Sequence, residues 1–160
     1  IHPTAIIEDG AELGTNVEIG PYCIVGSGVK IGNGCSLKSH VVLNGQTTIG
    51  TENIFHPFSY VGAEPQDLKY NQEKSLVIIG SKNIFREGVS VHRGTVGGGG
   101  KTIIGDDVFI GSNTSLIAPV TINEKSIVGA GSVITKSVNK KSLALSRSPQ
   151  IEIKNYKRKK

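Results

Sequence analysis

The first thirty residues of the chain divide into five blocks of six that begin alike. They read IHPTAI, IEDGAE, LGTNVE, IGPYCI and VGSGVK over residues 1–30. Each block opens with a large aliphatic residue, and its fifth residue is small or β-branched. A period of six fits neither the 3.6-residue turn of an α-helix nor the two-residue alternation of an ordinary strand. It is typical of a β-helix in which each hexapeptide supplies one short strand and one turn.

The six-residue step continues far beyond residue 30. Large apolar residues recur at this step up to Val61, then over residues 79–91, and then over residues 104–134. If three hexapeptides close one triangular coil, residues 18 apart stack and neighbouring coils pair as parallel strands about 4.8 Å apart. No coil buries its apolar face alone, so we expect one continuous core that includes Val91 and Phe109. The sequence predicts an all-β, parallel β-helix, whose handedness the repeat alone does not fix.

Two pauses interrupt the pattern, at residues 67–78 and 97–103. Each follows the second hexapeptide of a coil, so both inserted segments are expected to leave the prism at the same corner. Two loops stacked at one corner would make a wall suited to a binding site, although corners also tolerate insertions that have no function. We take residues 1–138 as a single β-helix domain and residues 139–160 as a basic C-terminal extension.

Composition limits the location of the protein. The 160 residues are 37% hydrophobic and 5% aromatic, and no apolar run approaches the 18 residues of a membrane span. No basic stretch followed by an apolar one suggests a secretory signal, so a cytoplasmic protein is expected. Methionine is absent even at position 1, from which we expect a trimmed or processed chain.

The positive charge is concentrated near the C-terminus. Residues 136–160 hold nine lysines and arginines against one acidic residue, and the whole chain has a net charge of +5. Only Tyr156 interleaves these charges with an aromatic ring, and no nucleic-acid motif precedes them, so nucleic acid is not an expected partner. The basic tail is either a solvated terminus or a segment attracted to cofactor phosphates or to an acidic carrier protein.

Neither a disulfide nor a metal site is expected. Cys23 and Cys35 are 12 residues apart, whereas side chains that stack in adjacent coils are 18 apart. We therefore expect two buried thiols. No cluster of histidines and cysteines has the spacing of metal ligands.

Four glycines at residues 97–100, followed by Lys101 and Thr102, are similar to a phosphate-binding loop. The first glycine of that motif is replaced by Thr95, and residues 103–105 continue as a repeat strand rather than as a helix. We therefore expect a corner loop in which Lys101 is a candidate phosphate contact.

His92 lies directly before this loop, at the outward position of its repeat. A histidine titrates near neutral pH and can act as a general base in acyl transfer, but a single histidine of this kind is more often a surface residue. Gln66, Asp67 and Lys69 begin the longer loop and could bind sugar hydroxyls and a diphosphate, although loops are polar in any case.

Several longer segments in the first hundred residues resemble one enzyme family. They are HPTA at residues 2–5, IGPYCIVG at 19–26, LKSHVV at 37–42, QDLKY at 66–70 and VHRGTV at 91–96. With them the chain resembles the UDP-N-acetylglucosamine acyltransferases of lipid A biosynthesis. The resemblance implies a left-handed β-helix, a homotrimer, a nucleotide-sugar substrate and an acyl-carrier-protein donor. It also implies that Gln66, Asp67, Lys69 and His92 stand where that family contacts its nucleotide sugar or acyl donor.

The resemblance changes from about residue 101. The segments TIIGDDVFIGS (102–112), LIAPVT (116–121), VGAGS (128–132) and LALSRSPQ (143–150) are similar to the acetyltransferase region of the bifunctional uridyltransferase/glucosamine-1-phosphate acetyltransferases. That resemblance implies an acetyl-CoA site along Ser112, Ala130 and Arg147, and we add Lys101 to it as a phosphate contact. We therefore expect a chimera joined near residues 97–103, engineered or recombined.

The junction affects the expected chemistry. In the lipid A family, the coil after the HRGT segment carries a histidine pair that includes the general base. The equivalent stretch here runs from Ser115 to Ala118, and no histidine follows His92. We therefore expect His92 to be an auxiliary catalytic residue, with the general base absent and catalysis weak or lost.

Three functions remain open. The chain is expected to be an acyltransferase scaffold like the UDP-N-acetylglucosamine O-acyltransferases, an acetyl-CoA-dependent amino-sugar acetyltransferase, or a purely structural engineered β-helix. No cofactor is expected to be tightly bound, because the donor would be an acyl-carrier-protein thioester or acetyl-CoA.

Overall fold

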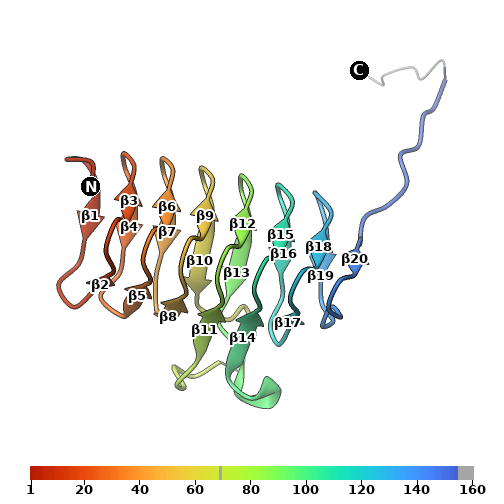
Figure 1. The fold of residues 1–160 in the computed structure, drawn as a ribbon. Helices are drawn as coiled ribbons and strands as arrows, with labels where there is room; N and C mark the ends of the chain where they lie inside the picture. Colours follow the sequence, from red (N-terminus) through yellow and green to blue (C-terminus); the bar gives the residue numbers. More distant parts are fainter. Residues whose placement is uncertain (69, 155–160) are drawn as a thin grey trace, which may run out of the picture.

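The computed structural model describes residues 1–68 and 70–154, which form a stack of short parallel strands (Figure 1). The strands belong to three sheets, and their order in each sheet follows the stack. The first sheet contains β1 (Ile6–Ile7), β4 (Ile24–Val25), β7 (Val42–Leu43), β10 (Tyr60–Ala63), β13 (Ser90–His92), β16 (Ser115–Leu116) and β19 (Val133–Ile134). The second contains β2 (Glu12–Leu13), β5 (Val29–Ile31), β8 (Gln46–Ile49), β11 (Leu76–Ile79), β14 (Lys101–Ile104) and β17 (Thr121–Ile122). The third contains β3 (Glu18–Ile19), β6 (Ser36–Leu37), β9 (Ile54–Phe55), β12 (Ile84–Phe85), β15 (Phe109–Ile110), β18 (Ile127–Val128) and β20 (Leu143–Ala144).

The register follows the hexapeptide period. Up to β19, and where no loop intervenes, residues 18 apart are paired, as in Val25 with Leu43 and Leu116 with Ile134. Every third strand up to β19 therefore returns to the same sheet, and each coil has three sides. The predicted all-β, left-handed parallel β-helix is confirmed.

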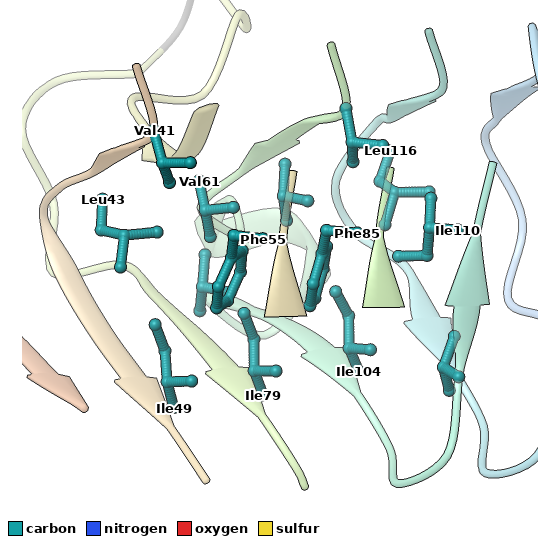
Figure 2. Packing of buried hydrophobic residues seen from close by; sticks show 14 of the residues in the cluster. Val41, Leu43, Ile49, Phe55, Val61, Ile79, Phe85, Ile104, Ile110 and Leu116 are labelled. Carbon is teal, nitrogen blue, oxygen red and sulfur yellow. The ribbon is translucent and has the colours of Figure 1, made fainter. Parts of the chain in front are cut away.

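The core is built from the residues that face into the prism. Phe55 and Phe85 stack there face to face (Figure 2). Their ring centroids are 4.5 Å apart, and their ring planes are 12° from parallel. Val91 is fully buried as expected. The expectation for Phe109 is wrong, because alternation within β15 turns Ile110 inward and leaves Phe109 half-buried on the outer face.

The core continues without a break past residues 97–103. β11 pairs with β14, with Ile79 opposite Ile104, and β13 pairs with β16, with Val91 opposite Leu116. Strand pairing and side-chain stacking therefore keep one register on both sides of this segment.

Two loops leave the prism at the corner between the first and second sheets, as predicted. The loop of residues 64–75 joins β10 to β11, and the loop of residues 93–100, which contains the 3₁₀ turn η1 (Val96–Gly98), joins β13 to β14. They project from neighbouring coils beside β11 and β14 (Figure 1). The strands that follow the loops, β11 and β14, begin at Leu76 and Lys101, inside the predicted pauses. Each is longer than the six-residue count predicts, because its first residues also pair with the strand of the coil before it.

The last strand, β20, lies within the segment 139–160 and pairs with β18. The domain division at residue 138 stays a prediction. Among the described residues, no helix has the length and apolar character needed to cross a bilayer.

Candidate functional site

A cavity of about 340 Å³ opens at the corner where the two loops project. It is lined by the longer loop, by the end of β13, by the shorter loop and by the turn after β16. The lining residues are Pro65, Gln66, Asp67, His92, Thr95, Ile117, Ala118 and Pro119. Polar side chains from the longer loop and β13 thus share one cavity with an apolar segment from the next coil.

The ring of His92 is held in one tautomer. Its Nδ1 lies 2.7 Å from the carbonyl oxygen of Glu64, and because a carbonyl only accepts, Nδ1 carries the hydrogen and donates it. In the neutral ring, Nε2 is then an acceptor, and the side-chain amide nitrogen of Gln66 donates to it over 3.3 Å. In its neutral form, His92 therefore has its hydrogen on Nδ1 and its lone pair on Nε2.

A β-bulge at Gly62 produces this contact. β10 and β13 pair residue by residue up to Val61 and Val91, but His92 pairs with Ala63, so Gly62 is an extra residue. Gly62 has φ of +87°, and a Cβ there would collide with the backbone carbonyl of Asn44. The bulge is part of the path that brings the Glu64 carbonyl over the His92 ring.

Arg93 fastens the longer loop to β13. Its side chain is only 13% exposed, and its Nη2 lies 3.5 Å from a carboxylate oxygen of Glu64 and 3.4 Å from the hydroxyl of Tyr70, to which it donates. The backbone N–H of Arg93 donates to the carbonyl of Ala63 at 2.9 Å. Glu64 therefore contacts two consecutive residues of the neighbouring coil, through its carbonyl and through its carboxylate.

The structure brings together three of the residues expected at a nucleotide-sugar site. Gln66, Asp67 and His92 all line the cavity, whereas Lys69 lies outside the described residues. Ala118 lines the same cavity and belongs to the stretch in which the lipid A resemblance implies a histidine pair. Ser115, at the start of that stretch, instead accepts a 3.1 Å hydrogen bond from the hydroxyl of Ser90.

The four residues expected at an acetyl-CoA site lie at two different corners. Lys101 lines a groove of about 440 Å³ along the second sheet, together with residues 119–121. Ser112 and Ala130 lie in successive turns between the third and first sheets, and Arg147 Nη1 donates to the carbonyl of Ala130 at 2.7 Å. Within one chain, Ser112, Ala130 and Arg147 thus form one group. Lys101 lies at a different corner of the prism.

The hydroxyl of Ser112 belongs to a cluster of charged side chains. It donates to the carboxylate of Glu87 at 2.9 Å, and Arg86 donates to both oxygens of that carboxylate at 3.0 and 3.1 Å. The pKa of Glu87 is lowered to about 2. The hydrogen bonds from Arg86 are the largest cause, and the hydrogen bond from Ser112 adds to them. His56 Nδ1 lies 3.3 Å from the same carboxylate.

Both cysteines are buried in the core and unpaired with each other. Cys23 Sγ donates to the carbonyl of Lys38 at 2.7 Å, and burial raises the pKa of both thiols. Within residues 1–68 and 70–154, no three histidine, cysteine or acidic side chains gather closely enough to hold a metal ion.

Sequence reasoning missed the residues that organise the cavity. Glu64 and Tyr70 lie in a loop without a repeat pattern, and Ile117 and Pro119 belong to the next coil of the stack. Two signals could have pointed to these residues. The polar residues 66–67 mark the longer loop that holds Glu64 and Tyr70, and the pairing of Val91 with Leu116 brings Ile117 and Pro119 close to His92.

Comparisons with known proteins agree with this geometry. The sequence pattern of the family described as bacterial transferase hexapeptide (six repeats) matches residues 1–33, 10–45 and 101–136. The solved structure of LpxA from Acinetobacter baumannii is 35% identical with a TM-score of 0.69, and the match covers 91% of this chain and 70% of that one. The UDP-N-acetylglucosamine O-acyltransferase of Moraxella catarrhalis is 32% identical with a TM-score of 0.67, over 91% and 70% of the two chains.

A third similar structure is the UDP-N-acetylglucosamine acyltransferase from Campylobacter jejuni. It is 27% identical to this chain with a TM-score of 0.66, and the match covers 91% of this chain and 71% of that one. The hexapeptide period, the three-sided helix and these matches lead to one conclusion: the chain belongs to the bacterial transferase hexapeptide family and has the β-helix of its UDP-N-acetylglucosamine acyltransferases.

Proposed function

We propose that the chain is an acyltransferase that moves an acyl group from a thioester to a hydroxyl of a nucleotide sugar bound in the corner cavity. The observation that carries the proposal is the meeting of Gln66, Asp67 and His92, from two neighbouring coils, in one cavity of about 340 Å³. The similarity to UDP-N-acetylglucosamine acyltransferases supports the choice of substrate.

Each polar residue of the cavity has a role in this proposal. The carboxylate of Asp67 and the amide of Gln66 bind hydroxyls of the sugar, and His92 polarises the attacking one. Backbone N–H groups stabilise the oxyanion of the acyl-transfer intermediate. The donor is an acyl-carrier-protein thioester that binds only for the reaction, in the cytoplasm, and lipid A biosynthesis is the proposed pathway.

The proposed reaction is slow. Ala118 lines the cavity in the stretch where the resemblance implies a histidine pair, and loss of the general base of such a pair typically costs 10²–10⁴-fold in rate. A purely structural role remains the alternative, and it predicts neither turnover nor sugar binding.

A direct assay tests the proposal. The purified protein is incubated with UDP-N-acetylglucosamine and acyl-carrier-protein donors of several chain lengths, and the ester product is detected by mass spectrometry. Ester that forms with wild type and needs a higher sugar concentration with Asp67→Asn supports the proposal. The matched control is Asp9→Asn, at the same corner of the first coil but outside the cavity. Absence of both ester and sugar binding refutes the proposal.

A second candidate is an acetyl-CoA-dependent amino-sugar acetyltransferase. It is favoured by the group formed by Ser112, Ala130 and Arg147, in which Arg147 is held by its 2.7 Å hydrogen bond to Ala130. Acetyl transfer from acetyl-CoA to the amine of glucosamine 1-phosphate, weakened by Arg147→Ala, would support this function over the first. The same assay with both donors separates the two.

We also propose a homotrimer. Ile24 on the first sheet and Leu143 on the third are exposed on outer faces, and at the corner between these sheets the rings of Tyr22, His40 and Phe58 stack with centroids 5.1 Å apart. Sedimentation velocity should give three times the monomer mass of 16.9 kDa, and a monomer would refute the assembly.

The change of resemblance near residues 97–103 remains the basis for proposing a chimera. A shared corner loop would let two β-helices join in register, and the unbroken pairing of β11 with β14 is compatible with such a junction. The gene tests this origin: two separate sources for residues 1–100 and 101–160 would support it, and a single natural reading frame would refute it.

A further inference from the structure

We infer that His92 is itself the general base of this chain, and that the carbonyl of Glu64 is the positioning group that makes it one. The inference rests on the proposed acyl transfer and assigns its proton-transfer step to a particular nitrogen atom. It gives His92 a larger role than the auxiliary one implied by the family resemblance.

The tautomer of His92 leaves one ring nitrogen able to accept a proton. A general base needs an unprotonated nitrogen that faces the substrate, and a histidine has one only when the other ring nitrogen carries the hydrogen. The 2.7 Å hydrogen bond to Glu64 places that hydrogen on Nδ1, so the lone pair is on Nε2. A carbonyl oxygen cannot donate, so no rearrangement of hydrogens at this contact would put the lone pair on Nδ1.

Few charged groups surround the ring of His92 among the described residues. Asp67 and His92 are the titratable residues among the cavity-lining positions that the structure describes. Two charged groups belong to residues next to His92: the guanidinium of Arg93, which follows it in the chain, and the carboxylate of Glu64, which follows β10. These two groups lie 3.5 Å from each other. In place of a second histidine, the methyl group of Ala118 lines the cavity, which leaves room for an acceptor beside Nε2.

Gln66 indicates where the attacking group binds. Its amide nitrogen donates to Nε2 over 3.3 Å, which is a long contact for a nitrogen donor. Because the Gln66 side chain is exposed, a substrate hydroxyl can displace it and donate to the same lone pair. The amide then becomes free to bind another oxygen of the sugar.

His92 takes a proton from the attacking hydroxyl and passes it to the leaving thiolate. The hydroxyl gives its proton to Nε2 of His92 while its oxygen forms a bond to the carbonyl carbon of the thioester. The carbon–sulfur bond then breaks, and the thiolate leaves with its electron pair and takes the proton from Nε2. The products are the sugar ester and the thiol, and His92 returns to its neutral form.

The nature of the positioning group explains why this base would be slow. A carboxylate behind a histidine orients the ring and stabilises the imidazolium with a negative charge, whereas a backbone carbonyl orients the ring with only a partial charge. The carbonyl therefore supplies tautomer and geometry but less charge stabilisation for the protonated intermediate.

The first test measures the tautomer and requires no turnover. Long-range ¹⁵N–¹H correlation spectra of wild-type protein at alkaline pH, assigned by comparison with His92→Gln, should show His92 with its hydrogen on Nδ1. A hydrogen on Nε2 would overturn the inference, whether or not acyl transfer occurs.

The second test separates chemistry from binding. His92→Ala and His92→Gln should each lower kcat at least 100-fold, while the dissociation constant for UDP-N-acetylglucosamine changes less than about threefold. Loss of a general base typically costs 10²–10⁴-fold. The matched control, His2→Asn, alters an exposed histidine of the first coil and should leave kcat unchanged. Melting curves confirm that each variant is folded.

The third test uses the sign of the charge beside Nε2. Gln66→Glu places a carboxylate at that nitrogen and favours the protonated ring, so the acidic limb of the kcat/KM profile should move to higher pH. Gln66→Leu removes the amide without adding charge and should not move that limb. An enzyme that turns over but keeps its rate in His92→Ala overturns the inference alone, whereas a wild type without turnover or sugar binding overturns the proposed function as well.

Discussion

The carbonyl oxygen of Glu64 and Nδ1 of His92 are 28 positions apart in the sequence and 2.7 Å apart in space. The contact joins a loop of one coil to the last residue of a strand in the next. Regular hexapeptide stacking alone would not produce it, because the bulge at Gly62 shifts the register of β10 against β13. The cavity therefore depends on a local exception to the repeat.

Gly62→Ala should destabilise the protein and disturb the site. The new Cβ would collide with the Asn44 carbonyl at a residue whose φ is +87°, so we expect a loss of about 1–3 kcal/mol in the free energy of unfolding. Thermal melting measures the loss. Gly97→Ala is the control, because its Cβ would meet no atom within 4 Å. Equal stability of the two variants would contradict the role of the bulge.

Phe85→Ala should open a cavity in the middle of the stack. Phe85 is fully buried and stacks on Phe55, and truncation of a buried phenylalanine costs about 3–5 kcal/mol. Leu68→Ala, at a side chain that is fully exposed on the longer loop, should cost less than about 1 kcal/mol in comparison. Chemical denaturation monitored by circular dichroism would show the difference, and similar midpoints would argue against a continuous core at this level.

Glu87 should make stability depend on pH under acidic conditions. The hydrogen bonds from Arg86 and Ser112 lower the pKa of Glu87 in the folded protein from 4.5 to about 2. Its stabilising contribution is therefore complete above pH 4.5 and is lost as the pH falls towards 2. Glu87→Gln should reduce the slope of the free energy of unfolding over this range, with Ser112→Ala in between. An unchanged slope in Glu87→Gln would contradict the assignment.

The two thiols should resist alkylation in the folded state. Burial raises the pKa of Cys23 and Cys35 and excludes reagents, so iodoacetamide at pH 8 should modify neither thiol without denaturant and both in 6 M guanidinium chloride. Mass spectrometry counts the adducts. Rapid modification of the native protein would mean that the coils around these residues open readily.

A histidine at position 118 should replace His92 if both positions address one substrate. Ala118 and His92 line the same cavity. The acyl-transfer rate of the double variant His92→Ala/Ala118→His should therefore be at least about tenfold higher than that of His92→Ala. The acyl-transfer assay measures this recovery. Recovery from a histidine introduced at Ala130, outside the cavity, would show instead that the effect is not specific to the site.

The sequence predicted the parts of the molecule that obey the repeat. Val91 and Ile110 are buried because an inward side chain at every sixth position is the pattern that closes a three-sided core. The expectation for Phe109 was wrong because neighbouring residues in a strand face opposite sides, so a shift of one position exchanges core and surface. The corner of the two loops was also predictable, since it follows from counting coils.

The organisation of the cavity was less accessible. The resemblance identified Gln66, Asp67 and His92, and the structure shows that they meet. The tautomer of His92 depends on a backbone carbonyl, which has no signature in the sequence, and the burial of Arg93 depends on how the longer loop folds over it. These features arise from the bulge and from contacts between coils.

The pairing of Val61 with Val91 survives twelve extra residues between them. The paired strands of the prism therefore stabilise the fold, whereas the corner accepts segments of different length and chemistry. Exchange of the loops at residues 64–75 and 93–100 would thus be a practical route to proteins that bind other acyl acceptors. The core around the stacked rings of Phe55 and Phe85 would stay unchanged.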